Sequence, residues 1–437
     1  MKIGFISMPL SGHLNPMTAL ARSLQARGHE IVFFGLPDAE RTVRFAGLRF
    51  VPFGEKEYPV GATPKAYSHL ARLRGEAVAR YSFYEMHPRR CETTLNQLPA
   101  RLETEDVDGL VIDTVHFFAE LAAIRLSIPY VHIWNILHID TSGQTPVCFV
   151  GWPYDNSAAA IARNLDAVKN YQANLAPVTA VAKNWAQSEG LQIDWSEPDA
   201  TLSNRAIITQ TPREFDLPNS SLPDHFHYAG PFKDAHGREP IFFPWDRLTG
   251  LPLIYASMGT LVNGDEGVFN TIIEAVAGIE RVQLVLSTGN NININALRPL
   301  PANAIVVPSL PQVELLAIAS VCITHAGINT VLEALSAGVP LVALPVGFDQ
   351  PGIATRITYH HVGESLPAAT LTSENLSAAI GNVLSNPIFR CNAQRLQEII
   401  AKTNGLKLAA DLIETSLATP GDHRPRTQSS GSCRDAG

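Results

Sequence analysis

The sequence predicts an α/β fold with two parallel sheets, because short apolar runs alternate with helical stretches in two separate series. The first series begins at Lys2, and the second begins at Leu251 after an aperiodic segment rich in Pro and Gly, 229–245. A length of 437 residues also suits two domains of roughly 200 residues each. We therefore expect an N-terminal domain at 1–232, a linker at 233–249, a C-terminal domain at 250–418 and, because large apolar side chains are almost missing there, a disordered tail at 419–437.

In the first series, a loop that follows the first strand carries the residue of greatest interest. The strands of the first series are expected at 2–8, 30–35 and 108–113, and a helix is expected after the last of them, at 117–126. Asn15 and Pro16 are expected to cap and start a helix that ends at Gly28. This places His13 in a strand-to-helix loop at the carboxyl end of a strand, where ligands bind in open α/β sheets. A polar and helical stretch, 144–203, completes this half.

The second series repeats the same alternation. Its strands are expected at 251–259, 281–287, 304–308, 321–325 and 340–345, and two of its helices at 269–276 and 329–337.

Composition excludes several classes of protein. A formal net charge of −8 leaves no basic face for a polyanion, so we expect no nucleic-acid partner. The five cysteines are odd in number and form no C-x-x-C pair, which indicates a reducing compartment and argues against a thiolate metal site. No apolar run reaches the roughly 20 residues of a membrane helix, and the N-terminus lacks the pattern of a signal peptide. We expect a soluble, cytoplasmic protein.

The segment THAGINTVLEALSAGVPLVALPVGFDQPG, 324–352, carries the strongest functional signal. A strand is expected to end at His325, Gly327 allows close backbone approach, and Asn329 and Thr330 open a helix. Backbone amides at such a helix start suit a phosphate or diphosphate.

Two further polar groups follow in the same segment. Glu333 lies about one turn into the helix, where it can accept hydrogen bonds from a ribose, and Asp349 and Gln350 follow the next strand, where they can hold sugar hydroxyls. Alone, a Gly-containing helix start is most often a tight turn and a post-strand Asp is most often a cap. Their convergence at successive strand ends favours a binding site.

Together with SMGT (257–260) and LPQ (310–312), this segment resembles the nucleotide-sugar signature of family 1 glycosyltransferases, and ASMGTL and FDQPGIATRITYHHVG are most similar to its bacterial zeaxanthin glucosyltransferase branch. The similarity extends from Lys2 to about Leu417. It implies a GT-B fold, in which two Rossmann-like domains face each other across a cleft, the acceptor lying mostly on the first and the donor mostly on the second. It also implies donor-site residues, namely Gly12, Ser257, Gly259, Thr260, Leu310, Gln312, His325, Gly327, Asn329, Thr330, Glu333, Asp349 and Gln350.

By this resemblance, His325, Asn329 and Thr330 would hold the diphosphate with Ser257 and Thr260 nearby. Glu333 and Gln312 would bind the ribose, and Asp349 and Gln350 the transferred hexose.

Two positions depart from the family's pattern. Ser309 stands where many relatives place an aromatic residue that stacks on uracil, so backbone groups around Leu310 are left to hold the base, and the choice between UDP and TDP sugars stays open. Ala326 replaces a glycine, a mild change if that residue keeps ordinary dihedral angles.

The resemblance assigns His13 as the general base and Asp113 as the residue that orients it. An acceptor hydroxyl is a poor nucleophile, and a neutral imidazole can take its proton as the bond to the anomeric carbon forms. The transfer would invert an α-linked donor to a β-glycoside, most simply with glucose from UDP-glucose. The helix dipole would stabilise the departing diphosphate, so the resemblance implies no essential metal and no tightly bound cofactor.

The acceptor is a small apolar molecule in this reading, with Phe83, Phe117, Trp134 and Trp152 as candidate pocket residues. A carotenoid, a flavonoid or other phenol, a terpenoid and a macrolide all stay open; a carotenoid would bring peripheral membrane contact.

Two alternatives stay open. Another GT-B enzyme, such as a nucleotide-sugar epimerase or a lipid-linked sugar transferase, would share Glu333 without needing His13 and Asp113. A non-catalytic helper would lose the base or the sugar-binding pair. A dehydrogenase is disfavoured, because the first loop reads SGHLNP and not G-x-G-x-x-G.

Overall fold

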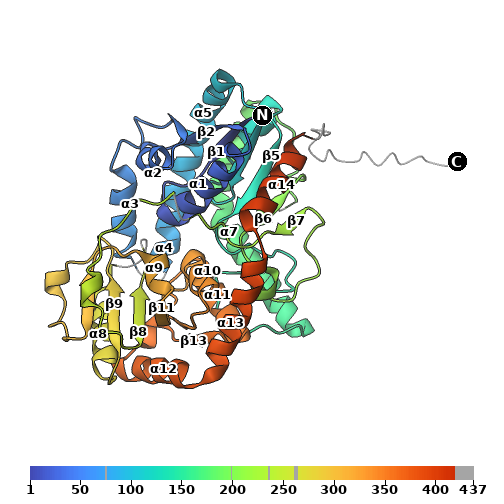
Figure 1. Ribbon diagram of the computed structural model, residues 1–437. Helices are drawn as coiled ribbons and strands as arrows, with labels where there is room; N and C mark the ends of the chain where they lie inside the picture. The colour runs from blue at the N-terminus through green and yellow to red at the C-terminus, as the bar shows by residue number, and fades with distance from the viewer. Residues whose placement is uncertain (74–75, 198, 235–236, 260–263, 419–437) are drawn as a thin grey trace.

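The protein consists of two halves, each built on its own parallel sheet (Figure 1). The computed structural model describes residues 1–437 except 74–75, 198, 235–236, 260–263 and 419–437. The predicted tail and Thr260 therefore lie outside the described residues. The two parallel sheets confirm the predicted α/β class.

The first half holds a seven-stranded sheet with the order β3-β2-β1-β4-β5-β6-β7. Its strands are β1 (Lys2–Ile6), β2 (Glu30–Gly35), β3 (Arg49–Pro52), β4 (Gly109–Asp113), β5 (Tyr130–Trp134), β6 (Ile207–Thr209) and β7 (Phe226–Tyr228). Its helices are α1 (Ser11–Gln25), α2 (Glu40–Phe45), α3 (Ala62–Leu70), α4 (Glu76–Arg80), α5 (His87–Glu105), α6 (Glu120–Leu126) and α7 (Ala158–Ser188), with a π-helical turn η2 (Tyr81–Met86) before α5. Strands such as β1 and β4 are mostly apolar and almost entirely buried, as expected for parallel strands that are covered on both faces.

The second half holds a six-stranded sheet with the order β10-β9-β8-β11-β12-β13. Its strands are β8 (Leu253–Ser257), β9 (Gln283–Ser287), β10 (Ala304–Val307), β11 (Ala319–Thr324), β12 (Leu341–Ala343) and β13 (Gly363–Ser365). The helices after β8 are α8 (Glu266–Ala277), α9 (Gln312–Leu316), α10 (Ile328–Ser336), α11 (Gln350–Tyr359), α12 (Ser373–Ser385), α13 (Pro387–Lys402) and α14 (Gly405–Ala418). Within the described residues, every helix is too short or too polar to cross a bilayer.

Helix α1 begins earlier than predicted. It starts at Ser11 with Leu10 as its N-cap, so the prediction that Asn15 caps it is wrong, and His13 lies in its first turn and not in a loop. The amides of His13 and Leu14 already bond to the Leu10 carbonyl at 2.9 and 2.8 Å. Pro16 lies inside the helix, and because proline has no N–H it leaves the carbonyl four residues back without its helical partner.

Helix α14 returns to the first half, although its residues follow the second sheet in sequence. Ile413 and Leu417 join the core formed by β1 and α1, and Arg27 pairs with Asp411 and Glu414 at 2.8 Å each. Figure 1 shows this red helix running along the first sheet. The predicted domain limits group 405–418 with the second half by sequence, whereas these residues pack on the first.

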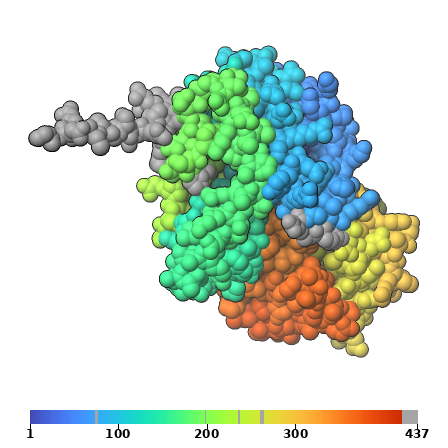
Figure 2. All heavy atoms as spheres, turned by 180° about the vertical axis from the view of Figure 1, so that it is seen from behind, coloured from blue at the N-terminus to red at the C-terminus, as the bar shows by residue number. Residues whose placement is uncertain are grey.

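The segment after β5 packs against the second half. Leu137 and Cys148 are buried in the core beneath α10 and α11, and the Gly352 amide donates to the Cys148 carbonyl at 2.9 Å. A Cβ at Gly352 would lie 2.7 Å from the Cys148 backbone, so this approach requires glycine. Figure 2 shows the teal residues near this segment beside the orange residues of the second half.

A buried ion pair joins the two halves at the same contact. Arg356 of α11 donates from Nε to Asp216 Oδ1 at 2.7 Å, both side chains are 2% exposed, and the Tyr228 hydroxyl donates to Asp216 Oδ2 at 2.6 Å. Burial raises the pKa of Asp216, but the charge of Arg356 and these hydrogen bonds lower it by more, so that the pKa is about 2.

We predict that Asp216→Asn lowers the free energy of unfolding by about 3–5 kcal/mol at pH 7, because it leaves Arg356 buried and unpaired. The folded pKa of Asp216 lies below its unfolded value, so the wild-type advantage is complete above pH ~4 and disappears as the pH falls toward 2. Urea unfolding at pH 7 and pH 3 measures both effects. Arg41→Gln, which breaks an exposed pair with Glu239, is the control and leaves unfolding nearly unchanged; equal effects of the two variants would contradict the prediction.

Candidate active site

His13 and Asp113 form a buried hydrogen-bonded pair at the carboxyl ends of β1 and β4. His13 Nδ1 lies 2.8 Å from Asp113 Oδ2, and the two strands are adjacent in the sheet. Because a carboxylate only accepts hydrogen bonds, Nδ1 carries the proton and Nε2 is left as the basic atom. The structure thus brings together the two residues that the sequence analysis paired across 100 positions.

Asp113 is held as a carboxylate. Burial raises its pKa, but the charge of His13 and the hydrogen bonds from His13 and Ser7 lower it more, so that the pKa lies below its ordinary value. The Ser7 hydroxyl donates to Oδ2 at 2.9 Å, and the Val115 amide lies 3.3 Å from Oδ1. Asp113 can therefore fix the orientation of the His13 ring and stabilise an imidazolium.

Asn329, at the start of α10, contacts the turn that carries His13. Its Nδ2 donates to the Gly12 carbonyl at 2.6 Å, and this is the carbonyl that Pro16 leaves without a helical partner. Its Oδ1 accepts from Gln210 Nε2 at 3.1 Å. The start of α10, predicted to hold a diphosphate, thus lies directly against the first turn of α1.

His325 explains two glycines of the predicted donor site. A Cβ at Gly259 would lie 2.5 Å from the His325 ring, and so would a Cβ at Gly327. Burial lowers the pKa of His325 to about 4, despite a hydrogen bond to the backbone of Ser257, so the ring is neutral at pH 7. Its Nδ1 is buried and has no hydrogen-bond partner among the described residues, as expected for a site that takes a polar ligand.

Ala326 does not keep ordinary dihedral angles. Its φ is +66°, in the left-handed region that glycine adopts without penalty. The condition under which the sequence predicted a mild change is therefore not met. Its fully buried methyl group packs in the core of the second half, which offsets part of the strain.

Glu333 and Gln312 contact each other. They also bond to Tyr255 and Arg238, two residues that no sequence pattern indicated. Gln312 Nε2 donates to Glu333 Oε2 at 2.6 Å, and the hydroxyl of Tyr255 donates to Gln312 Oε1 at 2.7 Å. Arg238, from the segment between the halves, donates to Glu333 Oε1. Both carboxylate oxygens of Glu333 therefore have protein donors.

Asp349 and Gln350 follow β12 and face the first half. Asp349 is buried, and its Oδ2 accepts from the Leu137 amide at 2.9 Å. Burial raises its pKa, while the Leu137 amide and the charge of His13 act in the opposite direction. Gln350 Oε1 accepts from the amides of Val346 and Gly347 at 2.8 and 3.0 Å, which folds the loop that presents Asp349.

Of the four candidate acceptor residues, two lie together and the other two lie elsewhere. Phe83 and Phe117 both pack on the His87 ring, with centroid distances of 5.3 and 4.9 Å. Trp134 is buried at the end of β5, and Trp152 lies under the Arg163 guanidinium. The remaining expected donor residue, Leu310, is buried, and the neighbouring Ser309 is exposed.

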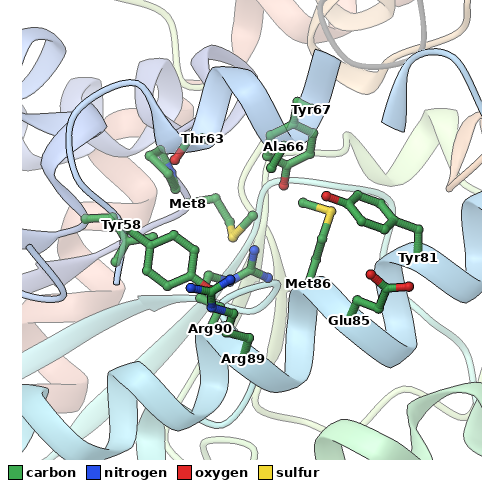
Figure 3. Close-up of a pocket in the computed structure, with 12 residues that line it drawn as sticks. Met8, Tyr58, Thr63, Ala66, Tyr67, Tyr81, Glu85, Met86, Arg89 and Arg90 are labelled. Atoms are coloured by element: carbon green, nitrogen blue, oxygen red, sulfur yellow. The ribbon is translucent and has the colours of Figure 1, made fainter. Parts of the chain in front are cut away.

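A cavity of about 150 Å³ lies beside the dyad and is lined by other residues (Figure 3). Its walls include Met8, Tyr58, Tyr67, Tyr81, Met86 and Arg90. The Met8 amide lies 3.4 Å from Asp113 Oδ2, so one wall is the loop that leads to His13. Alternating polar and aromatic residues in irregular helices gave no periodic signal for this wall in the sequence.

The fold is that of the GT-B glycosyltransferases. A solved glycosyltransferase of kitacinnamycin matches with a TM-score of 0.71 over 95% of this chain and 98% of that one, at 24% identity. The calicheamicin glycosyltransferase CalG4 matches with a TM-score of 0.70, again over 95% and 98%, at 22% identity.

The chain belongs to the family of UDP-glucuronosyl and UDP-glucosyl transferases, whose sequence profile matches residues 2–407. It is 29% identical to a zeaxanthin glucosyltransferase of Pantoea ananas, over 95% of both chains. It is 28% identical to demethyllactenocin mycarosyltransferase of Streptomyces fradiae, over 95% of this chain and 86% of that one. The predicted family and activity class are thus confirmed: the protein is a glycosyltransferase.

Proposed function

We propose that the protein transfers a hexose, most simply glucose from UDP-glucose, to a hydroxyl of a small and largely apolar acceptor, with inversion at the anomeric carbon. The observation that supports this best is the His13–Asp113 pair, bonded at 2.8 Å on the first half, in a turn whose Gly12 carbonyl accepts a hydrogen bond from Asn329 of the second half at 2.6 Å. The proposed base thus lies where the two halves touch. The named relatives, which include a glucosyltransferase, are consistent with this donor.

In the proposed reaction, His13 Nε2 takes the proton of the acceptor hydroxyl while Asp113 holds Nδ1–H. The acceptor oxygen forms a bond to the anomeric carbon as the bond from that carbon to the diphosphate breaks. UDP leaves with the bonding electrons, and the backbone amides at the start of α10 stabilise its charge.

The donor side of the proposal places the hexose on Asp349 and Gln350, the ribose on Glu333 and Gln312, and the diphosphate at the start of α10. Asp349 does not cap its own helix with its side chain, which leaves its carboxylate for other partners.

We predict that His13→Ala retains its affinity for UDP and lowers turnover on an aliphatic alcohol by about 10²–10⁴-fold. Asp113→Asn is expected to cost less, because the base stays in place. An acidic phenol, partly ionised near neutral pH, should depend less on the base, and its turnover by His13→Ala should rise with pH. Wild-type turnover of an aliphatic alcohol by His13→Ala would exclude His13 as the base.

We predict that Asp349→Ala weakens UDP-glucose binding about 10–100-fold and UDP binding much less, because a charged hydrogen bond to the hexose is lost. Calorimetry with both ligands measures the difference. Asp349→Asn keeps an oxygen for the Leu137 amide and separates sugar binding from damage to that contact. If both ligands are weakened equally, the hexose assignment is wrong.

The partners of Glu333 bear on the choice of nucleotide. A site whose polar groups depend on a substrate hydroxyl rejects an analogue that lacks it, because those groups are left unpaired. Here Arg238 and Gln312 already pair both oxygens of Glu333. When a donor with a 2′-deoxyribose binds, the Glu333 carboxylate therefore still has hydrogen-bond partners on both oxygens.

We predict that the affinity of the wild type for 2′-deoxy-UDP is within about tenfold of its affinity for UDP. Arg238→Ala is expected to increase the ratio of the UDP affinity to the 2′-deoxy-UDP affinity. Arg247→Ala is the control, since Arg247 is exposed in the same inter-half segment and its side chain bonds to the Ala304 carbonyl. Calorimetric titration with both nucleotides gives the ratio. An unchanged ratio in Arg238→Ala would show that Arg238 does not set this tolerance.

A further inference from the structure

The cavity beside the dyad is apolar on most of its wall and contains one buried cation. Tyr67, Met8, Tyr81 and Met86 pack in one cluster with Phe348, the residue before Asp349. The cavity therefore adjoins the loop that leads to His13, and the apolar cluster in its wall packs against the residue that precedes Asp349 on the second half. Figure 3 shows the aromatic and methionine side chains arranged around the Arg90 guanidinium.

Arg90 is 5% exposed and its partners are neutral. Its Nη2 donates to His87 Nδ1 at 2.6 Å and lies 3.5 Å from the Val115 carbonyl, and its guanidinium also bonds to the Tyr67 hydroxyl. In the described part of the chain, no carboxylate lies within 4.0 Å of it. Glu85 and Arg89, the other charged residues on the wall, are both exposed.

The surroundings of Arg90 are consistent with a positive charge that has no close counter-ion. Burial and then Arg90 lower the pKa of His87 well below its ordinary value, and the same two causes bring the pKa of His116 to about 3. Both rings are neutral at pH 7. The buried carboxylate of Asp113 is already bonded to His13 and Ser7.

A guanidinium without a counter-ion in an apolar cavity is costly, and a carboxylate is the partner whose geometry matches it best. We propose that the acceptor is an aromatic or otherwise largely apolar hydroxy acid, whose carboxylate pairs with Arg90 while its hydroxyl faces His13. This inference rests on the proposed transfer to an acceptor hydroxyl and narrows the class of acceptor. It makes Arg90 a residue that determines acceptor specificity.

The test compares 4-hydroxycinnamate with its carboxamide, which has nearly the same shape and no charge. With UDP present, the wild type is expected to bind the acid about 10–100-fold more tightly than the amide in calorimetry. Arg90→Gln should bring the two affinities within about threefold, and Arg90→Lys should keep part of the preference. Arg101→Gln removes an exposed charge from the same helix and should keep all of it.

A wild type that binds the acid no more tightly than the amide overturns the proposal, even if Arg90→Gln does not fold. A folded Arg90→Gln that keeps the full preference also overturns it. Transfer of glucose is measured separately with the same acceptors. Binding of the acid through Arg90 without transfer would support this inference and contradict the proposed function. Transfer to neutral phenols without any preference for the acid would support the proposed function and contradict this inference.

Discussion

The candidate site depends on one constraint: the carboxyl ends of two parallel sheets must meet. Residues that follow β1 and β5 touch residues that follow β11 and β12, through the Leu137–Asp349 hydrogen bond at 2.9 Å and the Asn329–Gly12 hydrogen bond at 2.6 Å. Pro16 makes that bond available, because it frees a helical carbonyl in the turn that carries His13. The buried Arg356–Asp216 pair and the Gly352–Cys148 approach hold the same surfaces together.

This contact gives each half a different chemical task. In the proposed reaction, the first half would supply a base whose tautomer is set by a buried carboxylate, and the second would supply helix amides and two carboxylates. Neither set alone can support the proposed transfer. Helix α14 packs on the first half after the chain has completed the second, so the chain itself also ties the halves together.

Much of the fold followed from the sequence, because buried parallel strands are continuous apolar runs. Strands such as β2 match their predicted limits, and the family signature named Gly12, Asn329 and Asp349, which lie at the contact between the halves. The predicted start of α1 was wrong because Asn15–Pro16 resembles a helix start in sequence, while the backbone hydrogen bonds to the Leu10 carbonyl begin the helix five residues earlier.

The residues that sequence could not indicate act through tertiary contacts. Arg238 lies in an aperiodic segment and bonds to Glu333, which is 95 positions away in sequence. The sequence around Arg90 does not distinguish it from a surface arginine, and only the packing of η2 and α5 shows that it is buried. The strained φ of Ala326 likewise depends on how β11 enters α10. Local sequence patterns do not predict contacts between residues that are distant in sequence.

The anomeric configuration of the product is the most direct measurement. With UDP-α-glucose and a phenolic acceptor, attack by an oxygen activated at His13, opposite the diphosphate held by α10, is expected to give only the β-glycoside, read by NMR of the isolated product. An α-glycoside would contradict the single-displacement geometry proposed for the contact between the two halves.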